Sequence, residues 1–188
     1  MPVILLIELA LEPATAVFAR VFVFVAVGAV LLLMLASLAR AATVKSARGY
    51  SISAPDGWRV VKGAMGTDLI LMAKPTNGFQ PNVNVVVRQA PRGVGLLQGR
   101  TDFEKSYQRL FADFKWMGRG TTKVGGETAL SNTASYSMGT PARKIFMHHV
   151  VTVHRGNVYS FTGTSLLSQR AALAPQFAAA FRTIKWTL

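Results

Sequence analysis

Residues 49–58 read GYSISAPDGW, and this stretch decides how the folded part of the chain begins. Residues 50–54 alternate apolar and small polar side chains, which predicts a β-strand with one buried face. The Pro-Asp-Gly sequence at 55–57 predicts a tight turn, because proline fixes φ at the first corner and glycine relieves the second. The chain resumes at Trp58, so this stretch indicates an antiparallel β structure.

The sequence downstream repeats short, alternating, β-branched runs between turn residues, which is typical of an antiparallel sheet. The last of these runs surrounds Ile184 and Trp186 and is expected to close the chain as a short strand or packed tail. The longer predicted strands are residues 58–61, 68–73, 82–89, 118–124, 127–138, 142–154 and 158–164.

Two helices are predicted among these strands. Residues 100–114 contain the capping box of Thr101 and Glu104 and carry apolar side chains at spacings of three and four. Residues 168–181 are predicted to form an alanine-rich second helix, with Pro175 near its first turn or at its true start. The predicted fold class is therefore α+β, with an antiparallel β-sheet flanked by helices.

An uncharged apolar stretch precedes the folded part. Residues 21–39 would span about 28 Å as a helix, close to the roughly 30 Å of a bilayer's hydrocarbon core. The stretch ends in Ala-Arg-Ala at 39–41, a pattern that signal peptidase accepts, so a retained anchor and a cleaved signal peptide both stay open. We expect a retained N-terminal transmembrane helix, because the apolar run is longer than the core of a usual signal peptide.

The chain thus divides into an apolar leader at 1–20, a transmembrane helix or signal peptide at 21–41, a linker at 42–48 and a globular domain at 49–188. The leader suits a helix lying in the membrane interface. The alternative is that the start codon has been assigned too far upstream. The cleavage-like site after Ala41 favours a domain on the periplasmic side of a bacterial inner or photosynthetic membrane. Counting basic flanking residues favours the cytoplasm instead, and we expect export.

Composition restricts the function classes. The chain has 21 Lys and Arg against 8 Asp and Glu, for a net charge of +13. The stretch before residue 42 contains two basic and two acidic residues, so the domain carries the whole net charge of +13. We expect this charge to attract membrane lipids or acidic proteins. Nucleic acid is not an expected partner, because no basic run alternates with exposed aromatics. The absence of cysteine excludes disulfides, thiolate metal sites and a thiol nucleophile.

Residues 49–58 resemble the opening motif of PsbP-like proteins, a Gly-Tyr pair followed by a proline and a Gly-Trp pair. The resemblance continues in residues 82–87, in the helix around Phe103 and in the hairpin of residues 148–161, and it covers residues 48–186. It implies an α/β/α sandwich. Members of this superfamily include extrinsic subunits of photosystem II, DcrB-like periplasmic proteins, a nuclear Ran-binding factor and chaperones for secreted effectors. The resemblance implies a protein that binds other proteins and does not catalyse a reaction. The expected anchor and the strong positive charge of this chain differ from the photosystem members.

Candidate chemistry is sparse in the residues themselves. His148, His149 and His154 share one predicted strand, where alternation separates them, and His148 and His154 would lie about 20 Å apart. The acidic residues are scattered, no Gly-x-Ser-x-Gly elbow occurs, and the paired glycines lack the context of a phosphate loop. We therefore expect no catalytic residues, no cofactor and no metal site; an enzyme whose site joins distant residues is the alternative.

Basic residues on either side of the predicted first helix, with one tryptophan among them, form the candidate partner-binding site. These residues are Arg88, Arg92, Arg100, Lys115, Trp116, Arg119 and Lys123. The sequence predicts a non-enzymatic, membrane-anchored accessory subunit that docks on a larger integral membrane complex. A photosynthetic reaction-centre complex is the first candidate partner, because of the PsbP-like resemblance. A cleaved, free periplasmic binding or chaperone protein is the alternative.

Overall fold

The computed structural model describes residues 42–64, 66–93 and 95–187, without the side chains of residues 98–100, 102 and 103. The predicted leader and transmembrane helix lie outside these residues. Within the described part of the chain, every helix is too short or too polar to cross a membrane.

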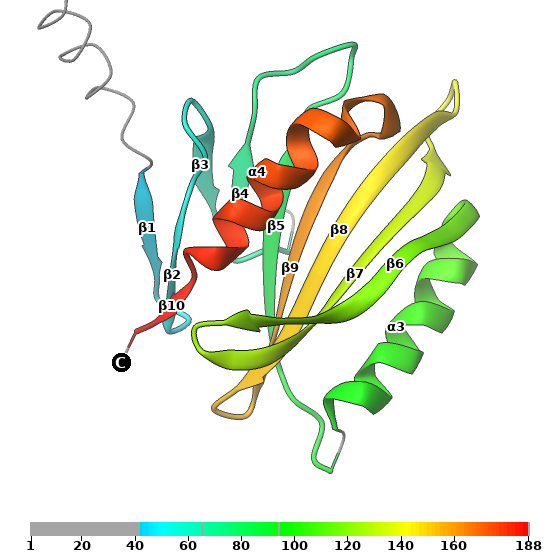
Figure 1. Cartoon of the computed structure of the whole chain (residues 1–188). Helices are drawn as coiled ribbons and strands as arrows, with labels where there is room; N and C mark the ends of the chain where they lie inside the picture. Colours follow the sequence, from blue (N-terminus) through cyan, green and yellow to red (C-terminus); the bar gives the residue numbers. More distant parts are fainter. Residues whose placement is uncertain (1–41, 65, 94, 188) are drawn as a thin grey trace, which may run out of the picture. The chain divides into compact units, whose positions relative to one another are not determined.

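Two antiparallel sheets organise the described residues (Figure 1). The smaller has the order β1-β2-β10, formed by Thr43–Ser46, Tyr50–Ser53 and Lys185–Trp186. The larger has the order β3-β4-β5-β9-β8-β7-β6. In chain order, its strands are β3 Arg59–Lys62, β4 Leu69–Met72, β5 Asn82–Gln89, β6 Ala112–Val124, β7 Glu127–Met138, β8 Arg143–His154 and β9 Asn157–Leu166.

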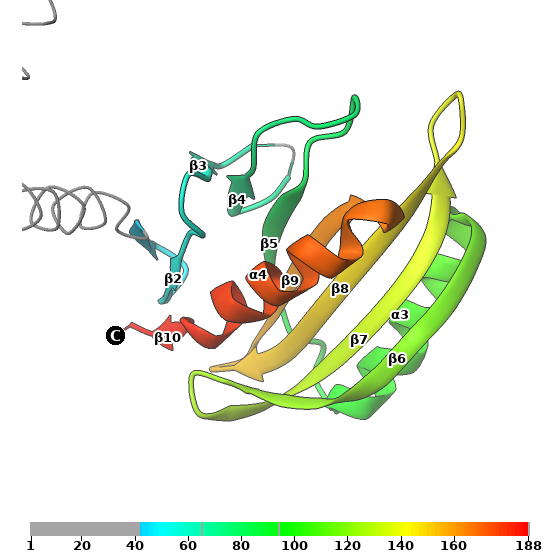
Figure 2. The same cartoon turned by 45° about the horizontal axis from the view of Figure 1, so that its top comes forward.

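Helices pack on both faces of the larger sheet. Helix α3 (Leu96–Leu110) lies over β6 and β7 on one face, and α4 (Arg170–Arg182) crosses the other face after the short 3-10 turn η1 (Leu167–Gln169) (Figure 2). The described chain is thus an antiparallel sheet with helices on both sides, which confirms the predicted α+β class.

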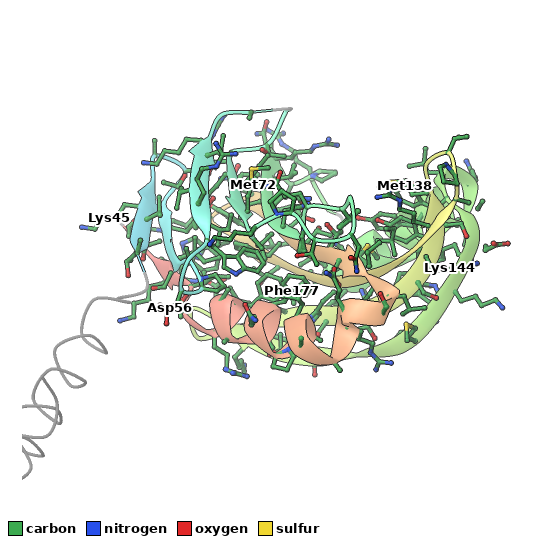
Figure 3. All side chains as sticks on the ribbon, turned by 90° about the horizontal axis from the view of Figure 1, so that it is seen from above. Lys45, Asp56, Met72, Met138, Lys144 and Phe177 are labelled. Carbon is green, nitrogen blue, oxygen red and sulfur yellow. The ribbon has the colours of Figure 1, made fainter. Side chains whose placement is uncertain are left out.

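The two faces hold separate apolar clusters. The cluster under α4 gathers fully buried rings from β2, β8, β9 and the helix, among them Tyr50, Phe146, Phe161 and Phe177. Figure 3 shows Phe177 between α4 and the sheet. The cluster on the α3 face includes Tyr136 and Met147. One sheet therefore has two buried sides, and this requires apolar side chains on both faces of β8 and β9.

The close approach of α4 to the sheet depends on Gly163 of β9. A Cβ atom at this position would lie 2.5 Å from Cγ of Phe177. Real Cβ atoms do not come this close to another atom, so only glycine lets the Phe177 ring rest directly on the strand.

The predicted strands are confirmed, with shifts at their ends. Strands β5 and β7 occupy the predicted residues, while β6 begins at Ala112 rather than at 118. Strand β10 shows that the C-terminal tail is a short strand. The segment expected as a linker, residues 42–48, contains strand β1, whose four residues pair with β2.

The first predicted helix was wrong at both ends. Helix α3 runs from Leu96 with Gly95 as its N-cap, so the predicted capping residue Thr101 lies within the helix. Phe114 lies in β6, because pairing with β7 takes the chain out of the helix from Ala112 onward. The aromatic spacing was nevertheless meaningful, since Tyr107 stacks on Phe114 with ring centroids 5.8 Å apart across the boundary.

The position expected for Pro175 was also wrong. It lies inside α4, because the helix starts directly after η1, at Arg170. An interior proline has no N–H for the carbonyl four residues earlier, so α4 lacks one of its ladder hydrogen bonds.

Candidate functional site

A groove lies between α3 and the part of the sheet formed by β5, β9 and β8. The C-terminal end of helix α3 is held against the sheet by Phe111, the residue after the helix. Its ring stacks on Tyr136 with ring centroids 4.2 Å apart. The described residues leave a cavity of about 630 Å³ beside the helix. Small-molecule sites in proteins typically have volumes of about 300–1,000 Å³, so this cavity has the size of a binding site.

Branched apolar side chains line part of the groove, beside polar side chains from β5 and β9. Val86 of β5, Val151 and Val153 of β8 and Val158 of β9 all lie on this face of the sheet. From the helix, Leu110 lines the groove while 73% of its side chain remains exposed. The groove therefore presents apolar surface without a described segment of the chain covering it.

The floor of the groove is polar but uncharged. Nε2 of His149 lies 2.8 Å from Oγ of Ser160, and the Tyr107 hydroxyl from α3 is hydrogen-bonded to Thr162. Burial, with a smaller contribution from His148, lowers the pKa of His149 to about 4, and burial raises the pKa of Tyr107. Both side chains are neutral at pH 7.

The Ser160 and His149 pair does not have the properties of a hydrolytic site. A general base works best with a pKa near the operating pH, and the pKa of His149 lies well below 7. Ser160 is nearly covered, with 9% of its surface exposed in the middle of β9. This hydroxyl therefore acts as a hydrogen-bonding partner in the sheet.

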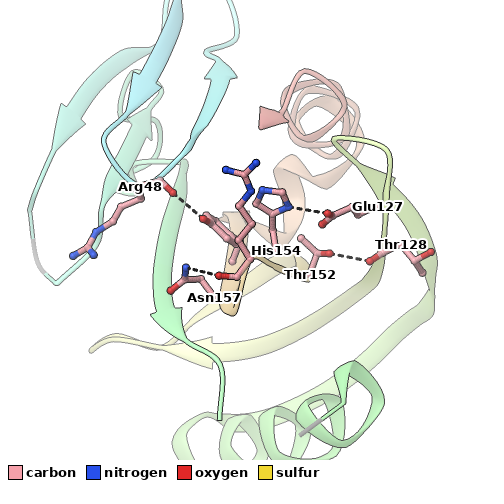
Figure 4. Close-up of polar contacts among 8 residues, drawn as sticks. Arg48, Glu127, Thr128, Thr152, His154 and Asn157 are labelled. Atoms are coloured by element: carbon pink, nitrogen blue, oxygen red, sulfur yellow. Dashed lines mark hydrogen bonds and ion pairs between the residues drawn. The ribbon is translucent and has the colours of Figure 1, made fainter. Parts of the chain in front are cut away.

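The three histidines lie in different surroundings, as strand alternation predicted. His149 faces the groove, while His148 packs against Phe181 of α4, 5.1 Å between ring centroids. His154 stacks on Trp186 at 4.2 Å, and its Nδ1 lies 2.7 Å from a Glu127 carboxylate oxygen (Figure 4). Nowhere in the described ranges do three potential metal-ligating side chains gather.

Three exposed lysines share the edge of the molecule formed by β1, β2, β3 and β10, and we call them the lysine face: Lys45, Lys62 and Lys185. Lys45 and Lys185 lie opposite Ser51 on either side of β2, so both point away from the buried Tyr50 and Ile52. Nζ of Lys62 donates to the carbonyl of Lys45 over 3.2 Å.

Some acidic side chains are engaged within the fold and others are paired at its surface. Asp68 accepts hydrogen bonds from Tyr50 and Ser46, at 2.7 and 2.6 Å. Asp113 pairs with Lys144 at 2.8 Å, and this lysine holds the pKa of Asp113 below its usual value. Both side chains of this pair are exposed, so it is a surface ion pair that adds little to stability.

The predicted partner-binding residues do not form one patch. Arg88 lines the groove and Arg92 is exposed in the loop before α3. Arg100 belongs to α3, and its side chain is outside the description. Lys115 pairs with Ser135 and so lies on the opposite face of β6 from its neighbour Trp116.

The structure does bring Trp116 and Arg119 together. The Arg119 guanidinium lies over the Trp116 ring, 5.0 Å from its centroid, and 3.5 Å from a Glu104 carboxylate oxygen of α3. Lys123 is farther along β6, where its Nζ donates to Thr128 over 3.0 Å. Trp116 and Arg119 thus help to seat α3 on the sheet.

The lysine face and the groove were not predicted from the sequence. Lys45 and Lys185 meet only because β1 and β10 both pair with β2, which no local pattern reveals, and Lys62 of β3 joins them through its hydrogen bond to Lys45. A signal for the groove was present: residues 150–153 read VVTV, with apolar side chains facing both sides of β8. Two apolar faces imply that both are covered by the chain or by a ligand.

Comparisons with known proteins place the fold. Family models and curated proteins gave no match to this chain. The solution structure of PsbP (CyanoP) from Synechocystis sp. PCC 6803 is 14% identical, with a TM-score of 0.59, over 79% of this chain and 93% of its own. LpqN of Mycobacterium tuberculosis, which is involved in cell envelope biogenesis, is 15% identical, with a TM-score of 0.60, over 79% and 91%.

The Ran-binding protein Mog1p of Saccharomyces cerevisiae is also similar. It is 8% identical, with a TM-score of 0.56, over 78% of this chain and 95% of its own. These proteins have different roles, and identities this low relate the folds alone. The PsbP-like resemblance seen in residues 49–58 is thereby confirmed at the level of structure. The described part of this chain has the PsbP/Mog1/DcrB-like fold.

Proposed function

We propose that this chain is a non-catalytic accessory subunit, anchored by residues 21–41, whose basic domain docks on a larger integral membrane complex. A photosynthetic reaction-centre complex is the first partner to test, because the fold is also that of a cyanobacterial PsbP. The domain lies on the exported side of the membrane in this proposal.

The lysine face is the observation that carries the proposal. Lys45 follows residue 41 by four positions, and four residues span at most about 14 Å. An anchored chain therefore keeps this face close to the membrane plane, where acidic loops of an integral complex and anionic headgroups lie. Lys62 and Lys185 add their charges at the same place.

Docking of this kind needs no strong contact. A tether raises the effective concentration of the domain over its binding site, so a weak, salt-sensitive interaction is sufficient.

The groove beside α3 favours a second candidate function. If the chain is cut after Ala41, the released domain is a free periplasmic binding or chaperone protein with an apolar site of about 630 Å³. The similar fold of LpqN, a cell envelope protein, is consistent with this alternative.

Reversing the charge of the lysine face tests docking directly. We expect the triple variant Lys45→Glu, Lys62→Glu, Lys185→Glu to stay in the membrane as the full-length chain. It should no longer co-migrate with its complex on native gels. The matched control reverses three exposed basic residues elsewhere, Lys74, Lys105 and Arg109, with the same change in net charge. Equal loss in both variants, or in neither, would contradict a role for this face.

A further inference from the structure

One end of the groove has the properties of an anion site. Arg88 lines this end of the cavity, together with Gln89 and with Gly95 and Leu96 at the start of α3. Arg88 pairs with Val158 at the end of β5, so its position is fixed by the sheet. Among the described residues that line the cavity, none is acidic.

The start of α3 adds to the positive character of the same end. Its N-cap is Gly95, no described side chain caps it, and its first turn contains no acidic residue. The first N–H groups of a helix have no partner within the helix and carry a partial positive charge. Arg88 and this helix end thus both offer donors to a negatively charged group.

Apolar surface extends from this end along the groove. Val158 is paired with Arg88, Val153 is paired with Val158 on its other side, and Val86 precedes Arg88 by two residues on the same face of β5. Met147 and Leu110 lie toward the far end, at the C-terminal end of α3. Between them the neutral hydroxyls of β9 form the floor. The groove is therefore positive at one end and apolar along its length.

We propose that this groove binds a single-chain amphiphile, with its anionic headgroup at Arg88 and the start of α3 and its apolar chain along β9. Such a ligand buries the exposed Leu110 and the half-buried Val86, Val153 and Val158, and its charge complements the arginine. This site goes beyond the docking role and is independent of it. The headgroup can be a carboxylate, as in a fatty acid, or a phosphate, as in a lysophospholipid.

An extended peptide fits this groove less well. Peptides that bind to sheets add a strand at a free edge, whereas β5, β9 and β8 are each paired on both sides. A peptide laid across the face would have to desolvate its backbone against valines, at a cost that an alkyl chain does not have.

Photolabelling of the full-length chain in phosphatidylcholine nanodiscs tests the site. The probes are a diazirine-bearing fatty acid, a diazirine-bearing lysophosphatidate and the corresponding neutral fatty alcohol, with labelled peptides mapped by mass spectrometry. We expect an anionic probe to label residues 84–88 and 147–164 about tenfold more than the alcohol does, since it gains charge-assisted hydrogen bonds. Whichever anionic probe labels more strongly identifies the headgroup.

Two variants and a control decide the outcome. Arg88→Glu should reduce anionic labelling about tenfold and leave alcohol labelling unchanged, while the exposed Arg59→Glu, outside the groove, changes neither. Val86→Trp should abolish labelling by filling the cavity, with thermal unfolding as the check that it folds. Equal labelling in Arg88→Glu and Arg59→Glu, or labels mapping away from the groove, would overturn the assignment.

Discussion

His149 stays neutral in the folded chain because its ring is removed from water. It is 1% exposed, and burial is the main cause of its lowered pKa, about 4 against an ordinary value of 6.5. The unfolded chain therefore binds a proton between pH 6.5 and 4 that the folded chain does not. The contribution of His149 to stability therefore falls as the pH decreases through this window, and it levels off below about pH 4.

The expected size of this acid effect is about 3 kcal/mol, from the linkage between pKa and stability. We expect His149→Gln to remove most of the loss of stability between pH 7 and 4.5, measured by urea unfolding at both values. His148→Gln is the control, because burial also lowers the pKa of His148. This variant should keep the larger part of the loss of stability between pH 7 and 4.5. An unchanged acid loss in His149→Gln would show that other groups dominate.

Site residues were predictable only where their position follows from alternation. The separation of His148 from His149 needs nothing more than the two-residue period of a strand. The grouping of Arg88 with Leu96 and Val158 is different, because it depends on which strands are neighbours and where α3 begins. Docking by the seven predicted basic and aromatic residues stays a prediction.

At the scale of elements, the close contact between α4 and β9 at Gly163 can be tested by substitution. We expect Gly163→Ala to destabilise the protein by about 1–3 kcal/mol, because the added methyl group displaces Phe177. Gly120→Ala in β6 is the matched control, since a Cβ there meets nothing within 4 Å and should change stability by less than about 0.5 kcal/mol.

Urea unfolding of the two glycine variants measures this difference. Both glycines lie in strands and neither adopts a positive φ, so backbone strain does not enter the comparison. If the two variants were equally stable, α4 would not rest on β9 as closely as described.

Strands were predictable because their alternation is local, whereas the ends of α3 were not. The spacing of Tyr107, Phe111 and Phe114 suits a helix, yet β6 takes over at Ala112, since its long ladder with β7 involves residues far along the chain. Strand β1 was missed for the same reason: the four residues TVKS have no strong pattern of their own, and their partner β2 supplies the order.

At the scale of the whole molecule, charge and architecture act together. The domain carries the entire surplus of +13, and carboxylates such as Asp68 have partners within the fold. The composition was enough to predict attraction to anionic surfaces, and an anionic partner stays a prediction. Only the pairing of β1, β2 and β10 shows that Lys45 and Lys185 lie on the same face of the smaller sheet.

The central claim is that the chain remains anchored and docked on a membrane complex, and its N-terminus tests this most directly. The measurement is the intact mass and N-terminal sequence of the protein isolated from solubilised native membranes. We predict a chain that retains residues 1–41 and co-purifies with a membrane complex in fixed stoichiometry, released by salt. A chain that starts at Ala42 in the soluble fraction would contradict this claim and leave a free periplasmic binding protein.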